Sequence, residues 1–465
     1  MKRPDTLSIR IAGRRIGLLP CLFAAGALVA GASAQAQSSP YSLLIGQRFG
    51  VDSNIFRVSN NEQRDYYSLT SVTVGLDQPI SRQRLYASAT ADYTAWKGND
   101  QLNGPGYNVL AGLGWEVGSR LTGDVRFNLR QAQANPADYG ALSGIASQKN
   151  RERSGTFDFR GAYGGIGLLA IETLYNHTNI DYSNDAFATR ERKSDTLGAG
   201  LRVRQTPDLN YGFMWRETRG EYPRGVVVPG GFLRDEYDRR DIDLSAGLRL
   251  SELTAFSGRV SYTKEDHDQI AARSFSGVTG EIAAVYRPTG KLELGASLSR
   301  DTGSGNQSSQ LAAMTGAGTT GSTGGTPTGT ATGTPGIVTG GTGLTGGTTS
   351  GTTGTGTGTS GYLTDARVSD RIRVSAQWDA TAKVRVNTAL TYARERYDTL
   401  FVTGTTGSFG QEKGSTRAAM LGARYEFSRA ISFECGVGYE SRDAGALVND
   451  YDATTGYCGA ALLLQ

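Results

Sequence analysis

The segment Leu121-Thr-Gly-Asp-Val-Arg-Phe-Asn-Leu-Arg130 alternates strictly between two kinds of side chain. Its odd-numbered positions are apolar or glycine, and its even-numbered positions are polar or charged. Successive side chains of a β-strand point to opposite faces, so a period of two indicates a strand rather than a helix. The segment therefore predicts a strand with one apolar face and one charged face.

The same alternation recurs along most of the chain, for example in the apolar set from Leu85 to Tyr93 and again from Ile242 to Leu248. Counting such segments predicts eighteen strands, at 41–50, 65–77, 83–97, 105–118, 120–132, 150–163, 165–179, 191–206, 208–220, 237–251, 253–267, 274–288, 290–302, 367–379, 382–398, 412–427, 429–442 and 453–465. Their number is even and most are about a dozen residues long, as in a single-chain transmembrane barrel. The predicted fold is an all-β, up-and-down antiparallel β-barrel.

The connections between these strands support the barrel. Short links such as Gly118-Ser119 and Ser428 follow the even-numbered strands, and longer polar links follow the odd-numbered ones. Short periplasmic turns and long extracellular loops alternate in this way in outer-membrane barrels, which predicts that both termini are periplasmic. A soluble sandwich or propeller is the alternative, but its core would be apolar, whereas here one face is charged in strand after strand.

Residues 1–36 resemble a secretory signal peptide. Lys2, Arg3, Arg10, Arg14 and Arg15 precede an apolar stretch, and Ala34-Gln-Ala36 offers small residues at the spacing of a cleavage site. The five basic residues and the one acidic residue of this segment, Asp5, account for the net charge of +4. The mature chain, 37–465, is therefore expected to be neutral and to form one barrel domain in the bacterial outer membrane, with no nucleic-acid partner.

One connection differs in composition from the others. Residues 302–366 are dominated by Thr, Gly and Ser and contain few apolar residues that could offset the entropy lost on ordering. Because they follow an odd-numbered strand, they are expected to form a disordered extracellular loop. Their glycines do not indicate a phosphate-binding loop, since no lysine follows and no helix is predicted there.

Several classes of chemistry are disfavoured by composition. The chain has 2 histidines and 3 cysteines, one of which lies in the signal peptide. His177 and His267 are expected to be solvated loop residues without a serine partner, and no enzymatic activity, cofactor or metal site is predicted. The acidic run Glu265-Asp266-His267-Asp268 could bind calcium weakly, with a solvated polar loop as the alternative.

The face opposite the apolar side chains carries charge of both signs and is predicted to line the lumen. This predicted lumen set comprises Asp124, Arg126, Arg130, Asp158, Arg160, Arg202, Arg204, Asp243, Arg249, Arg259, Glu281, Glu293, Arg371, Arg373, Arg385, Arg424 and Glu426. A barrel of this size leaves a water-filled bore. Such side chains could contact a polar solute, or they could pair across strands and merely stiffen the wall.

Cys435 and Cys458 fall in the last predicted hairpin. If its turn is centred near residue 447, antiparallel pairing sets the two cysteines opposite each other on the apolar face. A cross-strand disulfide and two lipid-facing thiols both remain open, and the oxidising periplasm favours the disulfide.

The segment Phe49-Gly-Val-Asp-Ser-Asn-Ile-Phe-Arg57 resembles the opening motif of a family of β-barrel porins, in particular the EpsL-like outer-membrane proteins of exopolysaccharide biosynthesis operons. Ile80-Ser-Arg-Gln-Arg-Leu85 and Leu102-Asn-Gly-Pro-Gly-Tyr107 are similar to that branch as well. The resemblance is strongest over residues 41–130. It implies an outer-membrane barrel that exports a polysaccharide chain, in contact with outer-membrane lipids and with periplasmic or inner-membrane polysaccharide synthesis and export components. The alternative is a general diffusion porin for small polar solutes.

Overall fold

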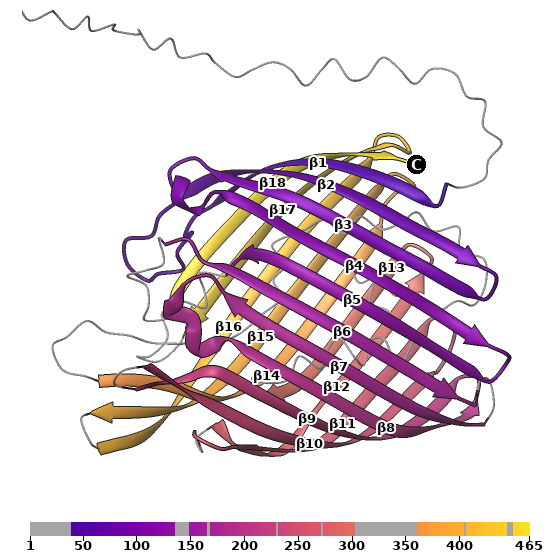
Figure 1. The fold of residues 1–465 in the computed structure, drawn as a ribbon. Helices are drawn as coiled ribbons and strands as arrows, with labels where there is room; N and C mark the ends of the chain where they lie inside the picture. Colours follow the sequence, from indigo (N-terminus) through magenta and orange to yellow (C-terminus); the bar gives the residue numbers. More distant parts are fainter. Residues whose placement is uncertain are drawn as a thin grey trace, which may run out of the picture. The chain divides into compact units, whose positions relative to one another are not determined.

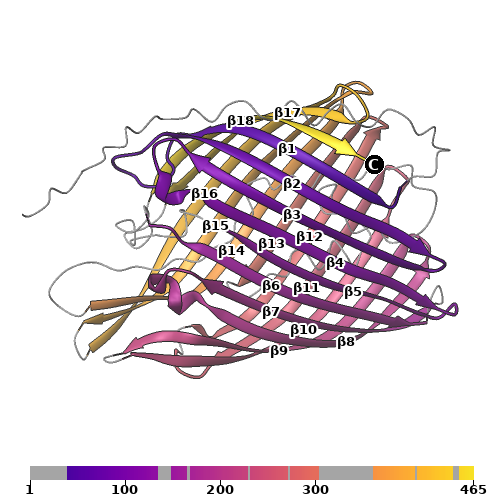
Figure 2. The same cartoon turned by 45° about the horizontal axis from the view of Figure 1, so that its top comes forward.

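A computed structural model of the chain describes residues 39–134, 148–164, 168–228, 231–270, 273–302, 360–403, 406–443 and 450–465. Eighteen strands form a single sheet in which each pairs with its neighbours in sequence, and β18 also pairs with β1 (Figures 1 and 2). The strands are β1 (Tyr41–Asp52), β2 (Asp65–Ile80), β3 (Gln83–Trp96), β4 (Gly104–Val117), β5 (Leu121–Gln133), β6 (Arg151–Tyr163), β7 (Leu169–Tyr182), β8 (Arg192–Thr206), β9 (Leu209–Val228), β10 (Gly231–Arg249), β11 (Thr254–His267), β12 (Phe275–Thr289), β13 (Leu292–Thr302), β14 (Ser360–Asp379), β15 (Val384–Thr403), β16 (Thr406–Glu426), β17 (Ile431–Asp443) and β18 (Tyr451–Leu464).

All the pairings are antiparallel, and the closing pair runs from Leu43 opposite Leu464 to Asp52 opposite Thr455. The predicted closed eighteen-stranded barrel is therefore confirmed. With strands about 4.8 Å apart and tilted by about 40°, eighteen strands close at a backbone diameter of roughly 35 Å. Such a wall is too wide for its own side chains to fill the space inside.

The short connections also lie where they were predicted. At one end of the barrel, short turns join β2 to β3 between Ile80 and Gln83, β4 to β5 between Val117 and Leu121, and β8 to β9 between Thr206 and Leu209. Gly118 adopts a φ of 62° in one of these turns, a conformation that glycine reaches without strain. β1 begins and β18 ends at this short-turn end, which faces the periplasm in outer-membrane barrels.

Two predicted long connections are wrong. β9 and β10 extend to Val228 and Gly231, and β15 and β16 to Thr403 and Thr406, so 221–236 and 399–411 are largely strand. Figure 1 shows β14, β15 and β16 projecting beyond the neighbouring strands. In the β9–β10 extension, the outward-facing side chains are charged, and Arg234 pairs with Glu221 at 2.6 Å and with Glu236 at 2.9 Å. A hairpin outside the bilayer can be polar on both faces. Its sequence then lacks the alternation of apolar and polar residues from which strands are predicted.

The outer face of the barrel carries a continuous band of exposed apolar side chains. This band runs from Ile242 on β10 to Leu250, just after the strand ends. On the extracellular side of Ile242, the outward residues from Arg240 back to Arg234 are charged and exposed. Nine residues of a strand tilted by about 40° span about 20–25 Å, which is close to the apolar height of an outer-membrane barrel. Exposed aromatic rings border the band, including Tyr163 near the short-turn end and Tyr262 near the other end.

The apolar exterior of the barrel suits the lipid bilayer. The closed sheet can lie there because it leaves no unpaired strand edge exposed to lipid. The chain is thus a bacterial outer-membrane β-barrel. Among the described residues, no helix is long and apolar enough to cross a membrane. The predicted signal peptide at 1–36 lies outside the described residues, as does most of the predicted Thr/Gly loop. The ends of that loop are corrected, since Thr302 belongs to β13 and 360–366 to β14.

Candidate functional site in the barrel lumen

The inner face is defined by the residues that alternate with the outward apolar ones. Every member of the predicted lumen set lies on this inner face, as the register shows, for example, for the directly opposite pairs Arg126 and Asp158 and Arg259 and Glu281. The structure distributes the set over three environments, which differ in burial and in ion pairing.

The first environment is a buried ionic network on β9, β10 and β11. Arg216 donates from Nε and Nη2 to the two carboxylate oxygens of Asp243, at 2.5 and 2.9 Å. Arg259 lies 3.6 Å from the same carboxylate, and the three side chains are 3–6% exposed. Asp243 and Arg259 were predicted as lumen residues. Both side chains are buried in ion pairs with residues of neighbouring strands.

The network continues toward the extracellular end through Arg239, whose side chain is 2% exposed. Arg239 lies 3.0 Å from Asp241 and 3.3 Å from Glu265, and it donates to the Thr302 hydroxyl at 2.6 Å. Thr263 in turn donates to Asp241 at 2.6 Å. Paired and hydrogen-bonded charges of this kind stiffen a wall rather than bind a solute.

The second environment consists of ion pairs that remain partly open to the lumen. They are Arg126 with Asp124 at 3.6 Å, Arg202 with Glu172 at 2.8 Å, Arg287 with Glu293 at 2.7 Å, Arg385 with Asp379 at 2.7 Å, Arg424 with Glu426 at 3.7 Å and the more distant Arg249 with Asp208 at 4.0 Å. Arg48 of β1 also pairs with Glu434 of β17 across β18. These pairs recur around the wall, on strands from β1 to β17.

The third environment holds charges outside such pairs. Within the described chain, no carboxylate lies within 4 Å of the guanidinium groups of Arg130, Arg160, Arg204 and Arg373. Asp158 and Glu281 complete this environment, and the Asp158 carboxylate accepts from Asn176 Nδ2 at 2.8 Å. Arg371, the last member of the set, has Asp301 and Glu281 as charged neighbours on the inner face. Arginine forks in this environment can donate hydrogen bonds to hydroxyls of a solute in the bore.

A compact apolar cluster lies at the long-loop end of the barrel. Ile55 and Phe56 of the β1–β2 connection, Leu102 of η1 (Asp100–Leu102) and Phe187 of η4 (Asp185–Arg190) are buried together. The β1–β2 and β7–β8 connections arise about a third of the way around the wall from each other. Their residues can meet only if the connections lean inward over the mouth, so this mouth cluster narrows the extracellular opening.

The motif that carries the resemblance, Phe49–Arg57, builds this cluster. Asp52 accepts from the Asn54 backbone at 2.9 Å and from Arg57 Nη1 at 2.8 Å. The fully buried Asn54 side chain donates to the carbonyl oxygens of Val58 and Asp452, at 2.7 and 3.0 Å. The motif therefore acts as a folded turn that positions Ile55 and Phe56 for packing.

The expectation that both histidines lie in loops is wrong, because both belong to strands. His177 lies within β7 on the outer face, where Nδ1 is 2.9 Å from Asp195. His267 ends β11 on the inner side, with its side chain 1% exposed, between Asp235 at 2.9 Å and Glu265 at 3.0 Å. The acidic run around it is therefore not a solvated loop, because Glu265 and His267 turn inward while Lys264 and Asp266 face outward.

His267 lies beyond the lipid band, level with Tyr237, which stacks on it at 5.0 Å between ring centroids. Burial alone would lower the pKa of His267, but hydrogen bonds to Asp235 and Glu265 outweigh burial and raise it. Burial likewise opposes ionisation of Asp235, yet its bond to His267 leaves its pKa lowered. Arg273 pairs with the same carboxylate at 3.2 Å, so the cluster ties the β11–β12 connection to β10.

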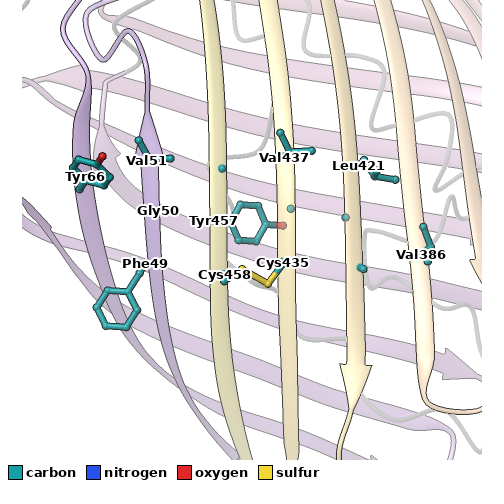
Figure 3. Close-up of a pocket in the computed structure, with 14 residues that line it drawn as sticks. Phe49, Gly50, Val51, Tyr66, Val386, Leu421, Cys435, Val437, Tyr457 and Cys458 are labelled. Carbon is teal, nitrogen blue, oxygen red and sulfur yellow. A yellow bond between two sulfur atoms is a disulfide. The ribbon is translucent and has the colours of Figure 1, made fainter.

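Cys435 and Cys458 lie directly opposite each other on β17 and β18, and the structure joins them by a disulfide. Figure 3 shows the bond beside Val437 and Phe49 in a shallow apolar depression of the outer surface. In the described residues, no group of three or more His, Cys, Asp or Glu side chains is arranged to hold a metal ion.

Sequence reasoning missed the lumenal aromatic rings Tyr67, Tyr86, Trp96 and Tyr457. Each falls on the polar parity of its strand, and the three tyrosines face a glycine on the neighbouring strand. An aromatic residue among polar positions was the available signal, but the facing glycine depends on register.

No family model and no curated protein sequence matches the chain. Solved structures match it at low identity. OccK1 (OpdK) of Pseudomonas aeruginosa is 11% identical, with 91% of this chain and 99% of that chain covered and a TM-score of 0.43. The siderophore receptor PirA of Acinetobacter baumannii is 7% identical, with 92% and 81% covered and a TM-score of 0.40. The ferric-catecholate import receptor Fiu of E. coli K12 is 9% identical, with 91% and 81% covered and a TM-score of 0.41.

Proposed function

We propose that this outer-membrane barrel is a channel that exports an exopolysaccharide across the outer membrane. The observation that supports it most is the dispersion of paired charge around the inner wall, from Arg48–Glu434 through Arg202–Glu172 to Arg385–Asp379. A polymer that slides through a channel needs many weak contacts, because one deep binding well would hold it back, as for ions in a multi-site pore.

The chemistry of this wall suits a chain rich in hydroxyl groups. Guanidinium groups donate and carboxylates accept hydrogen bonds, so paired charges can serve both roles of a hydroxyl without fixing a net charge for the solute. The resemblance over residues 41–130 agrees with this assignment. The proposal includes no catalytic step, and it requires periplasmic or inner-membrane components that deliver the polymer to the short-turn end.

A deletion strain tests the proposal against the alternative of a small-solute porin. Polymeric hexose in the culture medium and uptake of labelled glucose would be measured in parallel. We expect secretion to be lost and glucose uptake to be kept. Replacing Arg126, Arg202 and Arg371 together by Ala is expected to lower secretion while the folded barrel stays in the membrane. Normal secretion with reduced glucose uptake would instead favour the porin.

A further inference from the structure

Three lumenal tyrosines share an unusual relation to the strand beside them. Tyr67 lies directly opposite Gly50, Tyr86 opposite Gly112 and Tyr457 opposite Gly436 in the antiparallel register. A Cβ atom placed on these glycines would stand 2.3, 2.2 and 2.7 Å from the tyrosine ring. The ring therefore occupies the place of the missing side chain and lies down against the wall.

A ring that lies flat on the wall has one face on the strand and the other toward the bore. Figure 3, which looks at the outer surface, shows the Tyr457 ring face-on as it extends from β18 toward β17. All three tyrosine side chains remain partly exposed, and so does Trp96. Because the facing residue is glycine, each tyrosine ring can lie flat on the wall and present its face, rather than its edge, to the bore. We call such a ring an aromatic platform.

The rings come from β18, β2 and β3 and lie over glycines of β17, β1 and β4, so the platforms occupy the part of the wall between β17 and β4. The ring centroids of Tyr67 and Trp96 are 5.1 Å apart, and the Arg48 guanidinium lies 4.3 Å from the centroid of Tyr457. Tyr86 and Trp96 sit near opposite ends of β3, roughly 33 Å apart along the strand. We name Tyr67, Tyr86, Trp96 and Tyr457 the aromatic track.

Polar groups flank the track at hydrogen-bonding distance. The Tyr86 hydroxyl donates to Asp124 at 2.9 Å and accepts from Arg126 Nε at 3.4 Å. A pyranose ring has a C–H face that packs on an aromatic face and equatorial hydroxyls that need donors and acceptors at its rim. The track offers both, an apolar platform and charged groups beside it.

The opposite wall shows the same glycine pairing without an open ring. Tyr237 lies on Gly220, but His267 stacks on it at 5.0 Å and the tyrosine is 3% exposed. There the flat ring is fully covered. On β18, β2 and β3 the corresponding rings also have neighbours, since Arg48 lies over Tyr457 and Trp96 packs against Tyr67, but each ring keeps part of its surface exposed to the bore, where a ligand can reach it.

We infer that the aromatic track is a binding path on which successive hexose rings of the polymer stack as they cross the barrel. The inference rests on the proposed function and deepens it, because it assigns the path to one side of the wall and its ligand to the class of neutral pyranose chains. Such stacking is tolerant of sugar identity, as aromatic stacking of bases is tolerant of sequence.

Single-channel recording of the full mature protein in a planar bilayer tests the inference, with maltoheptaose as the probe. We expect the sugar to interrupt the ionic current. Replacing Tyr67, Tyr86 and Tyr457 together by Leu is expected to weaken this block about tenfold or more, the effect of losing about 1.4 kcal/mol of binding free energy. The Phe variants keep the ring face and should block as the parent does. Tyr93→Leu, on the outer face of β3, is the matched control and should have no effect.

A second readout does not depend on the triple variant inserting. Trp96 is the only inward-facing tryptophan of the four, all of which lie in described strands. Maltoheptaose should therefore change the emission of the folded parent and leave that of Trp96→Phe unchanged. Equal block by parent and Leu variant, or no emission change in the parent, would overturn the inference. Export lost on deletion but retained in the Leu variant would reject the track and leave the proposed function standing.

Discussion

Replacing Arg239 by Gln tests whether the buried ionic network stabilises the barrel. The side chain is 2% exposed and lies 3.0 Å from Asp241 and 3.3 Å from Glu265, which are 0% and 5% exposed. Breaking a buried pair from one side typically costs about 3–5 kcal/mol, because the partner keeps its charge without compensation. Arg216 remains 3.7 Å from Asp241, so we expect about 3 kcal/mol, at the lower end of that range.

The matched control is Arg249→Gln, on the same inner face of β10. Its guanidinium is 65% exposed and 4.0 Å from Asp208, so its loss should cost about 0–1 kcal/mol. Adding Glu265→Gln to Arg239→Gln removes a carboxylate that Arg239 no longer neutralises, but it also removes the contact of Glu265 with His267 at 3.0 Å, so we expect it to recover only a small part of the loss.

Urea unfolding of the protein in detergent micelles, followed by the fast-migrating folded band on an unheated gel, measures these differences. Unfolding of Arg239→Gln at the same urea concentration as Arg249→Gln would show that the buried network does not stabilise the barrel. A double variant less stable than the Arg239 single variant would show that Glu265 contributes through another partner.

Three further predictions concern other parts of the wall. Mass spectrometry without reduction should find Cys435 and Cys458 bridged in protein taken from the membrane, and two free thiols would contradict this. The raised pKa of His267 means that its stabilising charge is fully present below about pH 6.5 and is lost as pH rises through the folded-state value. Hydrogen exchange around 268–274, corrected for intrinsic rate, should therefore quicken above that pH in the parent but not in His267→Gln, and equal pH dependence in both would count against the cluster. Deleting 310–355 should leave the folded band intact, because loop closure depends weakly on length, and its loss would reveal a structural element there.

The alternation of apolar and polar residues was enough to predict the number of strands, their order and the face on which each charged residue lies. Period two reports the face directly, and a barrel admits only neighbour-to-neighbour pairing. The opposition of Cys435 and Cys458 could be proposed because a single short hairpin sets their register. Asp243 and Arg259 could be placed on the inner face from the alternation alone, without any knowledge of register.

The alternation shows on which face of the sheet a side chain lies, but it does not show which side chains surround it there. Arg259 and Asp243 are 16 residues apart in sequence, and the register between their strands decides whether Arg259 contacts Asp243 or solvent. Register also decides that a glycine lies beneath the ring of Tyr86. His267 appeared to be a loop residue because alternation weakens once both faces of a hairpin meet water. The long β9–β10 hairpin was missed for that reason as well.

The most direct test of the account is transport by the purified barrel. Vesicles loaded with the producing cell's own purified polysaccharide would be compared with and without the protein, alongside vesicles loaded with labelled glucose. We predict that the polymer leaves only the vesicles that contain the barrel. Release of glucose while the polymer stays inside would contradict a polysaccharide channel and identify a pore for small solutes.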